Sequence, residues 1–196
     1  MDLQQRILDH FEDSARLKRE SAAQLAGPIA DAVALITSAL AADRKLLVCG
    51  NGGSAADSQH MAAELVGRFE RERPELAAIA LTTDTSILTA VGNDYAFEEI
   101  FARQVRALGR SGDVLMAIST SGNSGSVLAA AQAARERGLS LVALTGRGGG
   151  ALGAMLGVGD VHLCVPHART ARIQEVHLLI IHCLCDGIDA SLMGEE

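Results

Sequence analysis

The apolar residues at the start of the chain follow a helical period. They recur every three or four positions from residue 3 to residue 11, and again from residue 29 to residue 40, on either side of Gly27-Pro28. This pattern predicts an N-terminal pair of helices within residues 1–43. Because no strand precedes them, we expect their apolar stripes to pack against the rest of the chain or against a second subunit.

From residue 45 the pattern changes to short apolar runs separated by glycine-rich turns and helical segments. Each run is too short for a helix and lacks polar alternation, so we predict five buried strands, at residues 46–49, 77–81, 114–118, 141–144 and 161–165. Intervening helices predict an α/β fold, in which residues 44–196 form a doubly wound, five-stranded parallel sheet with a long C-terminal helix. We expect residues 1–196 to form a single domain.

The composition narrows the class of protein. The 196 residues are 48% apolar and only 3% aromatic, and their net charge of −7 argues against binding to nucleic acid or to anionic membranes. The four cysteines form no pair of C-x-x-C clusters, which is typical of reduced thiols. The first residues are amphipathic and acidic rather than typical of a signal peptide, so we expect a cytoplasmic protein without a membrane span.

The first predicted strand is followed by a glycine-rich loop, Gly50-Asn51-Gly52-Gly53-Ser54. Glycines permit a tight turn and let a ligand approach the backbone, and we expect Ser54 to cap the following helix. Taken alone, the loop favours an ordinary strand-to-helix turn. In a doubly wound sheet, however, ligands bind at the carboxyl ends of the strands, where this loop lies.

A second loop, Ser119-Thr120-Ser121-Gly122-Asn123-Ser124, follows the third predicted strand and opens a helix. Its four hydroxyl groups and the free amides of a helix N-terminus suit the oxygens of a phosphate monoester. Simple capping needs one hydroxyl and leaves three unexplained. We therefore predict a phosphate site in this loop.

Candidate acid–base groups occur on two distant helical segments. His60 and Glu64 are four residues apart and share a helix face, although each alone is explained by an exposed position. Gln174 and His182 are eight residues apart and share a side of the last helix. His182 lies in the apolar run LLIIHCLC, so its ring is either a hydrogen-bonded core group or a functional one.

Four long motifs carry a family resemblance. The segments CGNGGSAADSQHMAAELVGRF, ALTTDTSILTAVGNDYAFEEIF, RQVRALGRSGDVLMAISTSGNS and ARIQEVHLLIIHCLCDGID resemble the bacterial phosphoheptose isomerases of the SIS (sugar isomerase) superfamily. The resemblance implies conversion of D-sedoheptulose 7-phosphate to D-glycero-D-manno-heptose 7-phosphate, for lipopolysaccharide heptose biosynthesis. It also implies a homotetramer with active sites between subunits.

Residue by residue, the resemblance implies a catalytic pair, Glu64 and His182. It implies zinc at His60, Glu64, Gln174 and His182. The substrate-binding positions that it implies are Asn51, Gly52, Gly53, Glu64, Arg68, Asn93, Asp94, Ser119, Thr120, Ser121, Ser124 and Gln174. Ala171 departs from the pattern, because some relatives carry an acidic side chain there, which puts one hydroxyl contact in doubt.

The isomerisation needs a base that moves a proton between C1 and C2 and an acid that serves O1 and O2, roles that suit Glu64 and His182.

The alternative is a sister branch of tetramers that associate with the replication initiator DnaA and that resemble this chain in RQVRALG and HCLCDGID. That branch looks to lack the acid–base pair, which is present here. The presence of the same pair also argues against a sugar-phosphate sensor that performs no chemistry. A dinucleotide enzyme is disfavoured because Ala55 stands where its fingerprint needs glycine.

Overall fold

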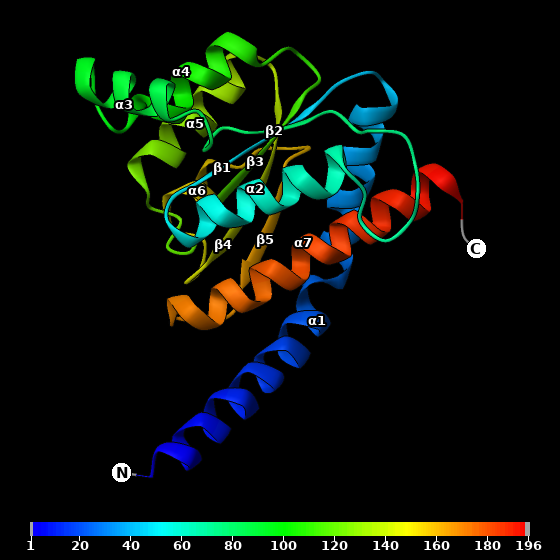
Figure 1. Ribbon diagram of the computed structural model, residues 1–196, viewed down its shortest axis with the longest axis vertical. Helices are drawn as coiled ribbons and strands as arrows, with labels where there is room; N and C mark the ends of the chain where they lie inside the picture. The colour runs from blue at the N-terminus through cyan, green and yellow to red at the C-terminus, as the bar shows by residue number, and fades with distance from the viewer. Residues whose placement is uncertain (1, 195–196) are drawn as a thin grey trace.

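The computed structural model describes residues 2–194 and shows a parallel sheet between two layers of helices (Figure 1). The strands are β1 (Leu46–Gly50), β2 (Ala78–Ala80), β3 (Val114–Ser119), β4 (Ser140–Gly146) and β5 (Val161–Val165). The helices are α1 (Leu3–Ala41), α2 (Gly53–Val66), α3 (Thr85–Asp94), α4 (Glu99–Leu108), α5 (Gly125–Glu136), α6 (Gly150–Met155) and α7 (Thr170–Met193). All five predicted strands are present, so the predicted α/β fold is confirmed.

The sheet has the order β2-β1-β3-β4-β5, and every neighbouring pair is parallel. Successive side chains of a strand point to opposite faces, so each strand serves two cores. In β1, Leu46 and Val48 join the core formed with α1, α2 and α7, whereas Leu47 and Cys49 join the core formed with α4, α5 and α6. Burial on both faces explains why the strands have continuous apolar sequences.

The predicted helical pair at the N-terminus is wrong, because α1 is one helix of 39 residues that contains Pro28. Proline removes one backbone hydrogen bond, and the Gly27-Pro28 step therefore suggested a break. The buried stripe of α1 nevertheless continues from Leu25 to Ala32 across this step, and α1 packs along α7. Tertiary packing overrides the local preference.

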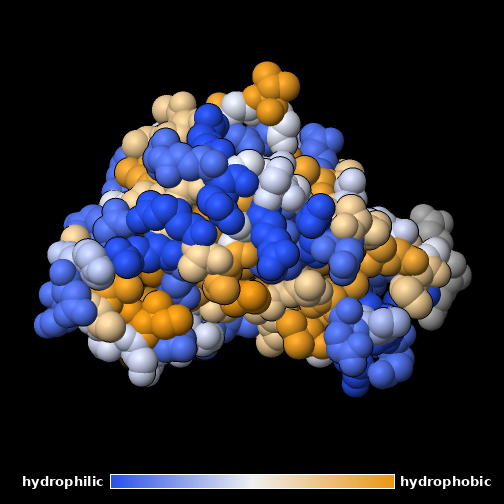
Figure 2. All heavy atoms as spheres, turned by 90° about the horizontal axis from the view of Figure 1, so that it is seen from above, coloured by the Kyte–Doolittle hydropathy of each residue, from blue (hydrophilic) through white to orange (hydrophobic). Residues whose placement is uncertain are grey.

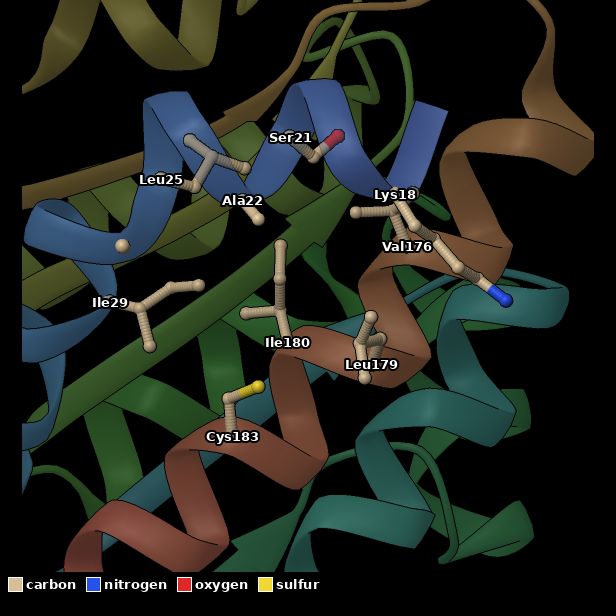
Figure 3. Close-up of a pocket in the computed structure, with 10 residues that line it drawn as sticks. Lys18, Ser21, Ala22, Leu25, Ile29, Val176, Leu179, Ile180 and Cys183 are labelled. Atoms are coloured by element: carbon tan, nitrogen blue, oxygen red, sulfur yellow. The ribbon is translucent and has the colours of Figure 1, made fainter. Parts of the chain in front are cut away.

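An apolar cavity of about 300 Å³, open to solvent on one side, lies between helices α1 and α7 (Figure 3). Its lining includes Leu25 and Ile29 from α1 and Leu179, Ile180 and Cys183 from α7. Both helices are long and apolar enough to cross a membrane by length and composition alone, although core helices of soluble proteins meet the same criterion. On the face of the molecule that Figure 2 shows, apolar patches lie among hydrophilic side chains.

The four cysteines carry free thiols, as predicted. Cys49 lies inside β1, and burial raises the pKa of its thiol to about 12. Cys185 lies inside α7, where burial raises its pKa to about 12 as well. Both thiols are therefore unreactive core groups.

Candidate active site

The candidate site lies where β1 and β3 end side by side. In this strand order the chain leaves β1 toward one side of the sheet and later returns to its other side, which makes the β1–β3 boundary the usual ligand position of a doubly wound fold. Asn51, directly after β1, donates from Nδ2 to the hydroxyls of Ser124 (2.8 Å) and Ser126 (2.9 Å). The glycine-rich loop and the serine-rich loop are thus joined directly.

A cavity of about 220 Å³ opens between these two loops and the start of α7. Its lining combines predicted positions with neighbours that were not predicted, namely Asn51, Ser54, Ile118, Ser119, Thr120, Ser121, Ser124, Thr170 and Gln174. Ser124 stands at the N-cap of α5, but its side chain makes no capping hydrogen bond and accepts from Asn51 instead. Simple capping therefore does not explain this hydroxyl.

Helix α7 approaches the glycine-rich loop very closely. A Cβ atom added to Gly53 would lie 2.3 Å from Nε2 of Gln174, so the missing side chain makes room for the amide of Gln174. Gly52, beside it, has a φ angle of +57°, which favours glycine. The predicted capping by Ser54 is wrong, because Gly52 occupies the N-cap and Ser54 lies inside α2.

The predicted acid–base groups lie on facing helices. On α2, Nε2 of His60 lies 2.9 Å from Oε1 of Glu64, and both side chains are partly buried. On α7, the ring of His182 lies edge-on to that of His60, with 5.1 Å between the ring centroids, and 5.6 Å from the ring of Phe69. His182 is only half-buried, and these contacts place it beside the α2 pair rather than in the core.

The predicted zinc ligands agree with zinc in their chemistry, because two imidazoles and a carboxylate are donors that zinc accepts. His60, Glu64 and His182 are also neighbours in space. Within residues 2–194, however, no three His, Cys, Asp or Glu side chains converge closely enough to hold an ion. An ion bound by both His60 and Glu64 would replace the present contact between them.

Six predicted substrate-binding residues do not line this cavity, namely Gly52, Gly53, Glu64, Arg68, Asn93 and Asp94. Gly52 and Gly53 lie in the adjoining glycine-rich loop, and Glu64 lies further along α2. Arg68 is exposed and donates to the backbone oxygen of Glu70. Asn93 and Asp94 lie at the end of α3, where Nδ2 of Asn93 donates to Oδ1 of Asp94 (2.8 Å). Their roles stay predictions.

Sequence reasoning missed several residues around the site. Ser126 is buried beside Ser124, and the signal was a further hydroxyl at the same helix start. Asp57 lies one turn before His60 on α2, and burial raises the pKa of its carboxyl group, whose Oδ2 has no hydrogen-bond partner. Arg73 is almost fully buried under the end of α2 and was hidden in the charged run ERERP.

His177 is a core residue rather than a site residue. It is fully buried, and its Nε2 lies 3.0 Å from the backbone oxygen of Thr145 on β4. Burial lowers the pKa of His177 to about 4, with the Thr145 hydrogen bond acting in the opposite direction. The ring is therefore neutral at pH 7. Its hydrogen bond to Thr145 connects α7 to β4 of the sheet.

Comparisons with known proteins agree with this geometry. The SIS domain family matches residues 9–146. Phosphoheptose isomerase of Methylibium petroleiphilum is 64% identical over 99% of this chain and 97% of its own length. The chain belongs to the phosphoheptose isomerase family. Phosphoheptose isomerase of Dechloromonas aromatica, another member, is 63% identical over the full length of both chains.

Solved structures of the family have the same architecture. Phosphoheptose isomerase GmhA from Neisseria gonorrhoeae superposes with a TM-score of 0.92 at 57% identity, over 96% of this chain and all of that one. A phosphoheptose isomerase from Francisella tularensis gives a TM-score of 0.94 at 47% identity, over 96% and 99% of the two chains. The long helices α1 and α7 are thus part of the family fold.

Proposed function

We propose that the protein converts D-sedoheptulose 7-phosphate to D-glycero-D-manno-heptose 7-phosphate, as a step toward lipopolysaccharide heptose. The observation that carries the proposal is the hydrogen bond from Asn51 to Ser124. It connects the serine-rich loop to the loop that leads into α2, the helix that bears Glu64. A phosphate held at Ser119–Ser124 would direct the sugar chain along α2 and α7. Relatives of 64% and 63% identity bear the name of this activity.

The serine-rich loop supports binding of the phosphate group. Ser119, Thr120, Ser121 and Ser124 line one cavity, and the first amides of α5 have no partner within the helix. Hydroxyls and helix amides together donate to an anion without needing a basic side chain. Binding at this remote group orients the reacting carbons.

In the proposed reaction, Glu64 removes a proton from C1 of the ketose and leaves an enediol intermediate. The same carboxyl group returns a proton to C2, which produces the aldose. His182 gives a proton to O2 and takes one from O1, so that protons and charge balance over the cycle. The partly buried contact between His60 and Glu64 supports this role, because a neighbouring imidazole holds the carboxylate in place.

Zinc is a further part of the proposal, with His60, Glu64, Gln174 and His182 as its ligands. Bound there, zinc would polarise the sugar carbonyl. The support is the set of donors and their arrangement on two facing helices. The proton transfers assigned to Glu64 and His182 do not depend on this ion.

We also propose a cytoplasmic homotetramer with sites between subunits. Apolar residues on the outer face of α1 and α7 support assembly, since Leu3, Phe11 and Leu179 are exposed in the single chain. A site between subunits would also explain why Asn93 and Asp94 lie outside the cavity lining of one chain. The free thiols support a cytoplasmic location.

The test is a coupled assay of the purified protein with sedoheptulose 7-phosphate. Turnover of this substrate, with none of the unphosphorylated sugar, is expected. A folded protein that shows no turnover with or without zinc contradicts the proposal. In that case, binding to purified DnaA would favour the initiator-associating alternative.

A further inference from the structure

Arg73 lies in the loop between α2 and β2, at the point where the two helices that carry the proposed catalytic pair meet. Its side chain is only 1% exposed. Nε of Arg73 donates to Oδ1 of Asp189 on α7 at 2.6 Å. Asp189 is itself buried, with 3% of its side chain exposed.

The other end of the same guanidinium binds the C-terminal end of α2. Nη2 donates to the backbone oxygen of Glu64 at 2.7 Å, and Nη1 donates to that of Leu65 at 2.8 Å. The last carbonyls of a helix have no partner within it and carry partial negative charge, so a cation is favourable there. Helix α2 has no basic residue in its own last turn, and Arg73 supplies one from the following loop.

The guanidinium group of Arg73 therefore connects the backbone of Glu64 on α2 to Asp189 on α7. His182 stands seven residues before Asp189, two helical turns away, on the helix that Arg73 binds. A contact between Sγ of Cys185 and Sδ of Met61 (3.7 Å) joins the same two helices between these points. The spacing of Glu64 and His182 consequently depends on the α2–α7 contact that Arg73 fixes.

We infer that Arg73, paired with Asp189, is a positioning residue that sets the separation of Glu64 from His182 for the isomerase reaction. The inference rests on the proposed function. Arg73 has no contact with the phosphate cavity, so its loss should impair the chemical step rather than substrate binding. Lysine cannot replace it, because one ammonium group cannot reach Asp189 and two carbonyl oxygens in the geometry of the planar fork.

The test compares Arg73→Lys with a control of similar structural cost. Asp113→Asn weakens another ion pair, in which Nζ of the partly buried Lys45 lies 2.6 Å from Oδ2 of the buried Asp113, at the opposite end of the sheet from the site. Both variants should lower the melting temperature. At a temperature where both are folded, kcat of Arg73→Lys should fall about 10- to 100-fold with an unchanged KM, because small misplacements of reacting groups have effects of this size.

Asp189→Asn provides a second variant if Arg73→Lys fails to fold. It keeps the shape of the side chain and removes its charge, and it should lower kcat in the same direction. The double variant should be no worse than the poorer single variant, since both changes act on one link.

The outcomes separate this inference from the proposed function. A wild-type protein without turnover contradicts the proposed function. An active wild type with kcat of Arg73→Lys and Asp189→Asn within twofold of normal contradicts the positioning role alone. So does an equal fall of kcat in Asp113→Asn at a matched loss of melting temperature.

Discussion

The Nε2 atom of His60 lies 2.9 Å from Oε1 of Glu64, so two of the four predicted zinc ligands are hydrogen-bonded to each other. A zinc ion bound by both residues would therefore have to replace this contact. The neighbouring ring of His182 makes a third donor available on α7. This relationship gives the metal proposal a direct test.

We predict that the purified protein binds zinc and that His60→Ala weakens the binding at least about tenfold, because one ligand is lost. Equilibrium dialysis with metal analysis measures this without reference to activity. His10→Ala, far from α2 in sequence, is the control. Equal zinc affinity in His60→Ala and wild type would remove His60 from the ligand set.

The serine-rich loop gives a prediction on substrate affinity. Ser119→Ala combined with Ser121→Ala should raise KM for the phosphorylated sugar. The loss of two charge-assisted hydrogen bonds should weaken binding by at least about 2 kcal/mol. Steady-state kinetics measures the change. Ser140→Ala, at the start of β4 and so at the far end of the sheet, should leave KM unchanged. An unchanged KM in the double variant would place the phosphate elsewhere.

The apolar face of α1 and α7 gives a prediction on assembly. Leu179 lines the α1–α7 cavity and is 41% exposed in the single chain. In a tetramer that covers this face, a carboxylate at this position would be buried without a partner. Leu179→Glu should shift the protein to smaller species, as measured by light scattering. Val158→Glu changes a fully exposed residue in the loop after α6 and should not. A monomeric wild type at micromolar concentration would contradict the assembly.

His177 gives a prediction on acid stability. Its pKa is about 4 in the folded protein and about 6.5 in an unfolded chain, so the unfolded state binds more protons between these values. The free energy of unfolding should therefore fall as the pH is lowered from 6.5 to 4, by up to about 3 kcal/mol from this group. Urea unfolding should show a weaker pH dependence in His177→Gln. The same dependence in both proteins would show that other groups cause it.

The sheet could be predicted from the sequence because each strand is buried on both faces. Such strands are continuous apolar runs, and all five were found within two residues of their observed ends. The continuous helix α1 could not be predicted, since the Gly27-Pro28 step is a local signal and the packing against α7 is not. Local patterns contain no information on which distant surface covers a helix.

In the candidate site, too, features set by neighbouring residues could be predicted and features set by distant contacts could not. The serine-rich loop was found because its hydroxyls are adjacent in sequence and form one cavity wall. Arg73 was missed because its partner Asp189 is 116 residues away, and a charged run on its own looks like a solvated surface. Asn51 was placed near the substrate by family resemblance, while its bonds to Ser124 and Ser126 became visible only in the structure.

Replacement of Glu64 tests the catalytic assignment. Glu64→Gln keeps the shape of the side chain and removes its basicity, so kcat should fall about 100-fold or more while the fold and assembly remain. His182→Asn should also lower kcat but should have less effect on exchange of the C1 proton with solvent, because that step is assigned to Glu64. Exchange lost equally in both variants would contradict the separate roles.

The most direct measurement is turnover of sedoheptulose 7-phosphate in D₂O by wild type and Glu64→Gln, with metal content measured in both. The account predicts that the protonated carboxyl group of Glu64 exchanges with solvent before it protonates C2, so that wild type yields the aldose phosphate with deuterium at C2. Glu64→Gln with the same metal content should lose both turnover and C1 exchange. Near-normal turnover by Glu64→Gln at equal metal content would contradict the account.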